Sequence, residues 1–226
     1  MNHQFEQIKE LYEESFSLHG DSPAALLTPK GRSELRFRAI APFLSENKVS
    51  ILDYGCGLGY LYEYLIKLGC NIDYTGVDIL PSFVQTCRQK YPDQAKFRVV
   101  DPTSDITKKF DVVFSSGVFN LATSADEKTS KEYAFNKLEQ LFKLANEALI
   151  CDFPSPFVDF KQDKAQHFSL EEIAKFCVDK LTRRFTLRHD LLPYEFTLTA
   201  YRRADIQRPE NFFKADSAIC DGGENG

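Results

Sequence analysis

Three glycines at alternate positions follow a short apolar run, and no other feature of the chain constrains its fold as strongly. Residues 49–53 predict a buried strand, and residues 61–68 predict a helix. Gly55, Gly57 and Gly59 lie between them. Glycines let a backbone adopt positive φ and approach a ligand closely, and a helix presents unpaired N–H groups in its first turn. The pattern predicts a ligand site at the carboxyl end of the first strand.

Short apolar runs alternate with helical segments through most of the remaining chain. Strands are predicted at residues 49–53, 74–78, 96–100, 110–115 and 148–153, and helices at 61–68, 82–91, 130–146 and 169–180. This alternation indicates βαβ units, which form a parallel sheet covered on both faces. Two later runs, residues 184–189 and 194–202, predict an antiparallel hairpin. The predicted fold class is therefore α/β, a Rossmann-like, doubly wound, seven-stranded sheet that is mostly parallel and ends in an antiparallel hairpin.

The chain shows no repeats and no linker that would divide the sheet domain. Residues 1–48 carry helical apolar spacing and are predicted to form an N-terminal helical cap. The sheet domain is predicted to span residues 49–204. The segment 205–226 ends in glycine and acidic residues and is predicted to be a disordered tail.

Composition excludes several classes of protein. The net charge of −5 disfavours broad contact with nucleic acid, which rewards a positive field. No apolar run approaches the roughly 20 residues that cross a bilayer, and the N-terminus is polar rather than a signal peptide. We therefore expect no membrane association and a cytoplasmic location. None of the six cysteines has metal-ligand spacing, so no metal site is expected.

The glycine spacing argues against a dinucleotide site. That fingerprint places its third glycine where this chain has Tyr60. In addition, Asp53 precedes the first glycine by two residues. A carboxylate at that position suits a cationic or amino-bearing ligand better than a pyrophosphate.

Two further acids follow the next two strands. Asp78 ends the second strand, 19 residues after Gly59, where an acid accepts hydrogen bonds from ribose hydroxyls. Asp101 follows the third strand, where a carboxylate is able to accept from an adenine amino group.

These motifs, in this order and spacing, resemble the class I S-adenosylmethionine-dependent methyltransferase superfamily. The resemblance implies that S-adenosylmethionine is the cofactor, that the three glycines lie beside its methionine part, and that Asp78 holds the ribose and Asp101 the adenine. The set of cofactor-binding residues that we expect from it is completed by Asp53, Ile79, Pro102, Ser116 and Arg36.

Arg36 is open to two interpretations. Its guanidinium has the fork that pairs with a carboxylate, so it is a candidate for the carboxylate of the cofactor. A solvated helix face explains it equally well. The pair Arg36-Phe37 and the run of residues 115–121 resemble a small, largely uncharacterised bacterial branch of the superfamily, associated with surface-polysaccharide or small-metabolite chemistry.

Motifs that would identify the methyl acceptor are mostly absent. The run after the fourth strand lacks the Asn/Asp-Pro-Pro-aromatic signature of enzymes that methylate amino groups of DNA. His167, just before a predicted helix cap at Ser169, is a candidate general base, with an ordinary loop histidine as the alternative. Asn120 is a candidate polar residue in the methyl-transfer pocket. We interpret both as candidate catalytic residues.

The sequence thus predicts a methyltransferase that acts on an oxygen or nitrogen of a small molecule or glycan precursor. Two alternatives stay open: a methyltransferase acting on RNA or a protein side chain, and a non-catalytic protein that binds S-adenosylmethionine. The oligomeric state is not predicted.

Overall fold

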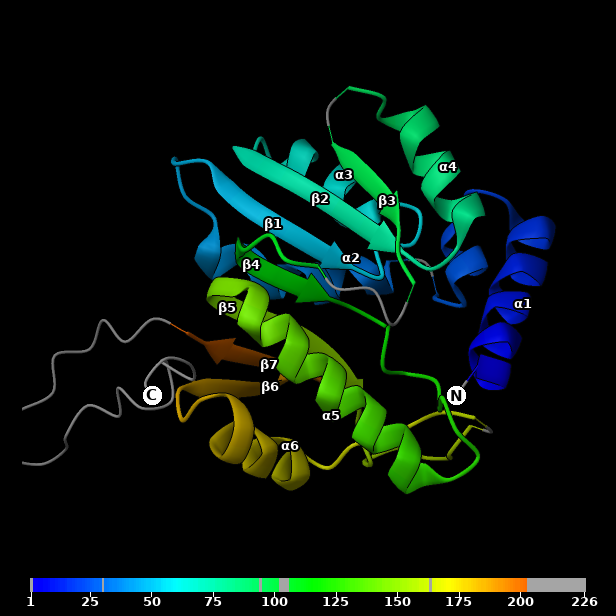
Figure 1. The fold of residues 1–226 in the computed structure, drawn as a ribbon, viewed down its shortest axis with the longest axis vertical. Helices are drawn as coiled ribbons and strands as arrows, with labels where there is room; N and C mark the ends of the chain where they lie inside the picture. The colour runs from blue at the N-terminus through cyan, green and yellow to red at the C-terminus, as the bar shows by residue number, and fades with distance from the viewer. Residues whose placement is uncertain (1, 30, 94, 102–105, 163, 203–226) are drawn as a thin grey trace, which may run out of the picture.

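The computed structural model describes residues 2–29, 31–93, 95–101, 106–162 and 164–202 of the 226-residue chain. It contains one seven-stranded sheet with the order β3-β2-β1-β4-β5-β7-β6 (Figure 1). The strands are β1 (Val49–Tyr54), β2 (Ile72–Asp78), β3 (Lys96–Val99), β4 (Phe110–Ser115), β5 (Ala145–Pro154), β6 (Phe185–Leu192) and β7 (Glu195–Tyr201).

Strand directions agree with the predicted class. β1 pairs in parallel with β2 on one side and β4 on the other, and β3 and β5 extend the parallel part outward. β7 runs antiparallel to both β5 and β6. The order of the strands reverses between β1 and β4, and in open α/β sheets the crevice at that reversal binds the ligand.

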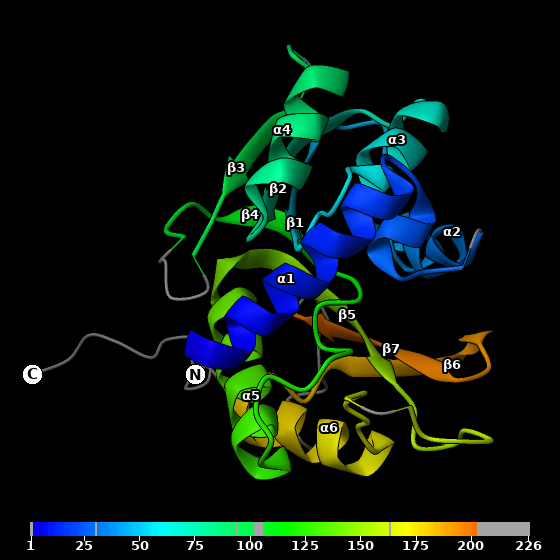
Figure 2. The ribbon, with the colours of Figure 1, turned by 90° about the vertical axis from the view of Figure 1, so that its right-hand side faces the viewer.

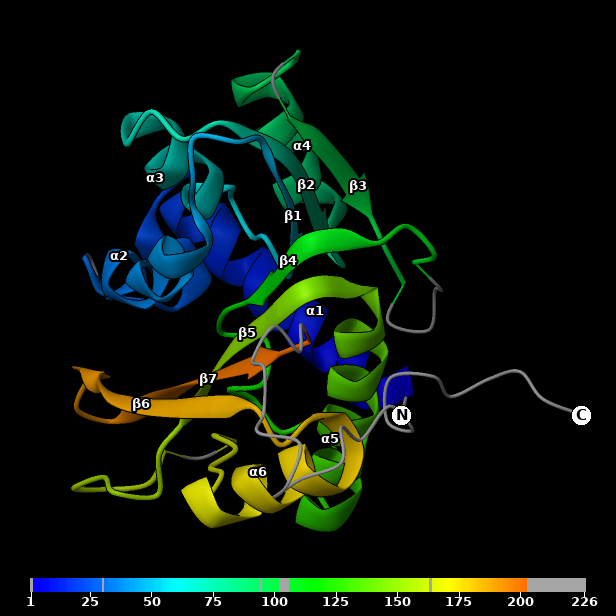
Figure 3. The same cartoon turned by 90° about the vertical axis from the view of Figure 1, so that its left-hand side faces the viewer.

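Helices cover both faces of the sheet (Figure 3). They are α1 (Asn2–His19), η1 (Pro23–Leu26), α2 (Arg32–Phe37), η2 (Arg38–Phe43), α3 (Tyr60–Lys67), α4 (Pro81–Lys90), α5 (Glu127–Leu144), α6 (Leu170–Phe176) and η3 (Cys177–Leu181).

Side chains alternate along each strand, so successive residues enter different cores. Ile51 packs with Leu65 of α3 in the core beneath α2, α3 and α4. Its neighbour Leu52 packs with Leu138 of α5 and Ile173 of α6 in the core on the other face. The sheet is therefore doubly wound, as predicted.

Helix α1 crosses the edge of the sheet at which the parallel strands end (Figure 2). Near its start, the ring of Phe5 contacts Tyr133 of α5, with the ring centroids 5.0 Å apart. Nearer its end, Tyr12 and Phe16 contact Phe83 of α4, with centroids 6.2 and 5.4 Å apart. The helix is thereby anchored to both halves of the molecule and lies over the space between them.

Some predicted boundaries are wrong. The helix predicted at 130–146 begins at Glu127, because the Asp126 side chain accepts the N–H of Thr129 as a cap. It ends at Leu144, since Ala145 is extended and already belongs to β5. The predicted helix at 169–180 has an α-helical first part, which Ser169 caps, followed by the π-helical turn η3.

The predicted tail at 205–226 lies outside the described residues. Among the helices that the structure describes, none is long and apolar enough to cross a bilayer.

Candidate functional site

The loop between β1 and α3 bends back over the end of β2. Gly55, Gly57 and Gly59 have φ angles of 80°, 53° and 78°, a region that residues with a Cβ rarely adopt. The N–H of Gly55 donates to the main-chain oxygen of Val77 over 2.8 Å. The N–H of Gly57 donates to a carboxylate oxygen of Asp78, also over 2.8 Å. These bonds hold the loop against the end of β2 in a conformation that glycine favours.

Two of these glycines also leave no room for a side chain. A Cβ at Gly55 would lie 2.2 Å from Val118 Cγ2, and a Cβ at Gly57 would lie 2.9 Å from Leu26 Cδ2. All four residues line one cavity of about 540 Å³. The main chain of Gly55 and Gly57 thus lines the cavity, and a side chain at either position would collide with a neighbouring residue.

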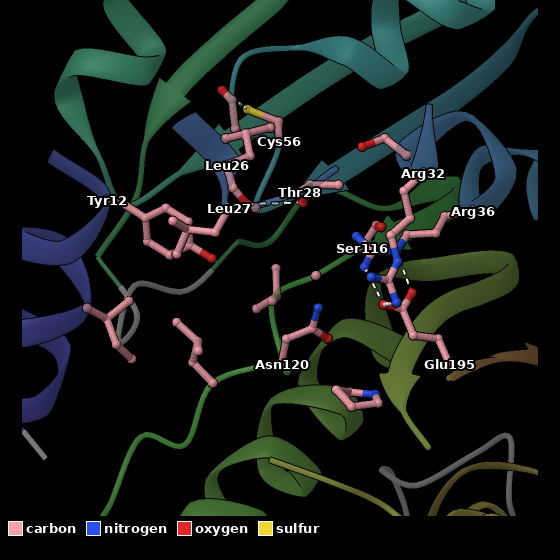
Figure 4. Close-up of a pocket in the computed structure, with 18 of the residues that line it drawn as sticks. Tyr12, Leu26, Leu27, Thr28, Arg32, Arg36, Cys56, Ser116, Asn120 and Glu195 are labelled. Carbon is pink, nitrogen blue, oxygen red and sulfur yellow. Dashed lines mark hydrogen bonds and ion pairs between the residues drawn. The ribbon is translucent and has the colours of Figure 1, made fainter. Parts of the chain in front are cut away.

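The cavity occupies the crevice at the end of the sheet, beneath α1. Figure 4 shows Tyr12 and Leu26 on one side of it and the pair Arg36 and Glu195 on the other. Its volume falls within the range of about 300–1,000 Å³ that is usual for small-molecule sites. The sheet edge, the glycine loop and α1 therefore enclose one site of small-molecule size.

Asp78 lies buried at the end of β2 and lines the cavity, as does the adjacent Ile79. Its two carboxylate oxygens accept the N–H groups of Gly57 and Leu80, over 2.8 and 3.0 Å. Burial raises the pKa of this carboxyl, and these main-chain hydrogen bonds oppose the rise. A carboxylate oxygen has more than one acceptor site, so Asp78 is able to accept hydroxyls from a ligand as well.

Asp53 ends up behind the glycine loop rather than exposed in it. The residue is 4% exposed, and the Tyr74 hydroxyl donates to its carboxylate. Burial raises its pKa to about 7, the Tyr74 hydrogen bond opposes this shift, and the charge of Asp78 adds to it. Two buried acids at one end of a cavity disfavour each other's charge, and a cationic ligand would relieve that cost. The two acids therefore fit a ligand with a positive centre.

The expected adenine-binding residues lie at the margin of the site. Asp101 is exposed after β3, while its neighbour Val100 lines the cavity. Burial raises the pKa of the Tyr133 hydroxyl on α5 to about 12, and the charge of Asp101 adds to this rise. Pro102 lies outside the described residues.

Arg36 lines the cavity, but the expectation of a free guanidinium fork is wrong. Its Nε and Nη2 each donate to Glu195, both over 2.7 Å, and Asp152 lies 4.0 Å from Nε. The fork is therefore occupied by a protein carboxylate, and neither bond uses Nη1. The alternative of a solvated helix face is wrong as well, since Arg36 is buried. Ser116 lines the cavity beside this pair, and the N–H of the adjacent Gly117 donates to Asp152 over 2.8 Å.

Asn120 and His167 come together on the opposite wall from α4. His167 Nδ1 lies 2.7 Å from the main-chain oxygen of Ser155. Since a carbonyl only accepts, Nδ1 carries the proton, and Nε2 of the neutral ring is an acceptor. Nε2 and the Asn120 Oδ1 are both buried without a hydrogen-bond partner in the described part of the chain. Both residues line the cavity, so each offers an acceptor atom to which a bound ligand is able to donate.

Sequence reasoning missed three polar groups of this region. Glu195 forms an ion pair with Arg32 as well as with Arg36, and Arg32 Nη2 lies 2.7 Å from Glu195 Oε1. Gln166 lies next to His167 and is buried. An acid near the start of the predicted strand at 194–202 was a signal for Glu195, but its partners are 159 and 163 residues away in the chain.

We expect the replacement of Asp53 by Asn to remove a pH-dependent destabilisation. The folded pKa of about 7 lies above the unfolded value of about 4. The folded state therefore favours the protonated acid, and the wild type loses stability as the pH rises from about 4 to about 7, by up to about 4 kcal/mol at roughly 1.4 kcal/mol per pH unit. Urea unfolding should show the advantage of Asp53→Asn growing across this interval.

The control is Asp73→Asn, which changes a partly exposed acid on the same strand as Tyr74. Its stability difference from the wild type should not follow this trend. An Asp53→Asn difference that stays constant with pH would contradict the assignment.

Comparison with known proteins identifies the family. The model of the methyltransferase domain family matches residues 45–187, more than half of the chain. A "Putative methyltransferase" of Mycobacterium tuberculosis is 25% identical over 151 residues, which cover 66% of this chain and 90% of that protein. A malonyl-[acyl-carrier protein] O-methyltransferase of Acetivibrio thermocellus is 30% identical over 77 residues, 33% of this chain and 27% of that protein.

Solved structures share the fold. Magnesium protoporphyrin IX methyltransferase from Synechocystis, solved with bound S-adenosylmethionine, superposes with a TM-score of 0.58 at 17% identity and covers 88% of this chain and 97% of that one. The match to the family model extends from just before β1 into β6 and includes the whole glycine loop. The chain belongs to the methyltransferase domain family and is an S-adenosylmethionine-dependent methyltransferase of the class I superfamily.

Proposed function

We propose that this methyltransferase acts on an oxygen or nitrogen of a small molecule or glycan precursor, and that His167 accepts the proton that the acceptor loses. The hydrogen bond of its Nδ1–H to Ser155 carries the proposal, because it leaves Nε2 as a buried, unpaired acceptor at the cavity. A base so placed contributes roughly 10²–10⁴-fold to the rate of such a transfer.

The cofactor supplies a methyl group made electrophilic by a sulfonium. In our proposal the main chain of residues 55–57, which lines the cavity, contacts the methionine part, and Asp78 accepts the ribose hydroxyls. Gly59, which we also expected beside the methionine part, is the N-cap residue of α3 and packs near Cys87 and Tyr91 instead of lining the cavity. The buried carboxyl groups of Asp53 and Asp78 favour a cofactor that carries a positive charge, as the sulfonium does. Ile79, Ser116, Asp101 and Pro102 complete the proposed cofactor contacts. Arg36, held by Glu195, would offer its Nη1 alone rather than a fork.

Asn120 would position the acceptor. Its unpaired Oδ1 is suited to receive an N–H or O–H of the acceptor molecule. The main-chain N–H of Gln166 donates to the main-chain oxygen of Asn120 over 2.9 Å, and Leu121 and Ala165 form a β-bridge alongside. These contacts hold the segments of Asn120 and His167 together. Such alignment of reactants accounts for as much as about 7–11 kcal/mol of a barrier.

The position of α1 favours a small acceptor over a macromolecule. Phe5, Ile8 and Tyr12 of this helix line the cavity from above, and rings of α4 and α5 anchor the helix. An RNA or a folded protein would have to insert a single group beneath α1. The net charge of −5 also disfavours RNA as the methyl acceptor, because RNA binding requires positive charge.

Asp78→Ala tests the cofactor half of the proposal. Loss of a hydrogen bond to a charged group costs roughly 1.5–3 kcal/mol, so the dissociation constant for S-adenosylhomocysteine should rise roughly 10- to 150-fold in calorimetric titration. Asp73→Ala, at the other end of β2, should leave it unchanged. Wild-type affinity in a folded Asp78→Ala protein, judged by circular dichroism, would show that the ribose lies elsewhere.

His167→Gln tests the acceptor half. With an acceptor identified by screening nucleotide sugars and small hydroxy acids, its kcat for S-adenosylhomocysteine formation should fall at least about 100-fold. The affinity for S-adenosylhomocysteine should stay the same, because the proposed role is confined to the acceptor. The matched variant is His19→Gln, an exposed histidine at the end of α1. Turnover of His167→Gln at the rate of His19→Gln would rule out the proposed base.

A further inference from the structure

A second cavity of about 520 Å³ lies next to the site, between α1, the segment that leads into α5 and the segment that precedes α6. It shares Ile8, Leu121, Ala165 and His167 with the first cavity. The candidate base therefore stands where the two cavities meet. A molecule that presents its reacting atom to His167 has room to extend into the second cavity.

Gln166 is a buried polar side chain that lines only the second cavity. It is 4% exposed. The N–H of Thr123 donates to Ser130 Oγ over 2.8 Å, and the Ser130 hydroxyl in turn donates to Gln166 Oε1. In this arrangement the amide oxygen of Gln166 faces Ser130, and its Nε2 faces away from that hydroxyl.

Gln166 Nε2 is buried and makes no hydrogen bond to any described residue. Buried polar groups in folded proteins are almost always paired, so an orphaned donor that lines a cavity indicates a ligand atom that accepts from it. That ligand atom would be an oxygen with a free lone pair.

The charges around the second cavity indicate an anionic oxygen. Lys161 and Lys164 both line it, and its acidic lining residue, Glu127, is paired with Lys131 over 3.0 Å. The remaining surface is largely apolar, with Leu11 of α1 opposite the segment that precedes α6. The combination suits an apolar body that ends in a carboxylate.

We propose that the second cavity binds the distal end of the methyl acceptor, and that this acceptor is an elongated small molecule with a carboxylate that receives the Gln166 Nε2–H. The inference rests on the proposed function, because it places the hydroxyl or amino group of the same molecule at His167. It narrows the acceptor class to hydroxy or amino carboxylic acids.

The test uses 4-hydroxyphenylacetate, 3-(4-hydroxyphenyl)propionate and 4-(4-hydroxyphenyl)butyrate, each with its uncharged methyl ester. Binding to the full-length protein is measured by calorimetry with saturating S-adenosylhomocysteine. At least one acid should bind, and it should bind more tightly than its ester. Gln166→Leu should weaken the acid about tenfold and Lys164→Glu about threefold, while ester binding stays within about twofold.

The matched control is Lys109→Glu, an exposed lysine just before β4 at the opposite end of the sheet. It reverses one charge without touching either cavity and should leave acid binding unchanged. Lys164→Glu, on an exposed segment, keeps the test valid if Gln166→Leu fails to fold. The inference is overturned if no acid binds, if acid and ester bind alike, or if the folded variants weaken both equally.

The two proposals fail in different ways. If the acids bind with this preference but His167→Gln does not slow transfer to them, the carboxylate site stands and the base is misassigned. If His167→Gln slows transfer to an acceptor that has no acidic group, the proposed function stands and the second cavity has another role.

Discussion

The main-chain N–H of Gly57 donates to the buried carboxylate of Asp78, and this bond couples β1 to β2 at the edge of the sheet where ligands bind. To make it, the loop must bend back over β2 with positive φ at its glycines. The bond also holds Asp78 in the cavity wall, close enough to Asp53 for their charges to interact. The same contact thus fixes both the loop conformation and the position of the Asp78 carboxylate in the cavity wall.

The acceptor side depends on a second, independent set of bonds. The connection after β5 returns to the segment after β4, and a main-chain hydrogen bond from the Gln166 N–H to the Asn120 oxygen joins them. That return places His167 at the cavity, and the Ser155 oxygen then selects which ring nitrogen is free. Between the two halves, Arg36 and Glu195 form a buried ion pair. Such a pair tolerates burial because Arg36 donates through both Nε and Nη2 to the two oxygens of Glu195.

The cofactor half of the molecule could be predicted because its signals are local. Buried parallel strands are near-continuous apolar runs, and Asp78 is the last residue of its strand, so the local pattern was enough to place both in the fold. The acceptor half could not be predicted so well. Glu195 meets Arg36 only because β7 inserts antiparallel beside β5, and no local pattern reports that contact across 159 residues.

Boundaries failed where tertiary context overrides local preference. Ala145 and Asn146 continue the helical spacing of α5, yet they start the buried strand β5. The burial of the Gln166 side chain likewise depends on tertiary context rather than on local sequence. A glutamine beside a histidine in a loop carries no sign of burial, which here depends on Ser130 of α5 and on the bridge at Leu121.

A crystal structure of the protein with bound S-adenosylhomocysteine would test the central claim most directly. The account predicts ribose hydroxyls within hydrogen-bonding distance of Asp78, main-chain contacts along residues 55–57, and a sulfur that faces Asn120 and His167. A ligand bound away from the glycine loop, or one whose sulfur faces away from His167, would contradict it.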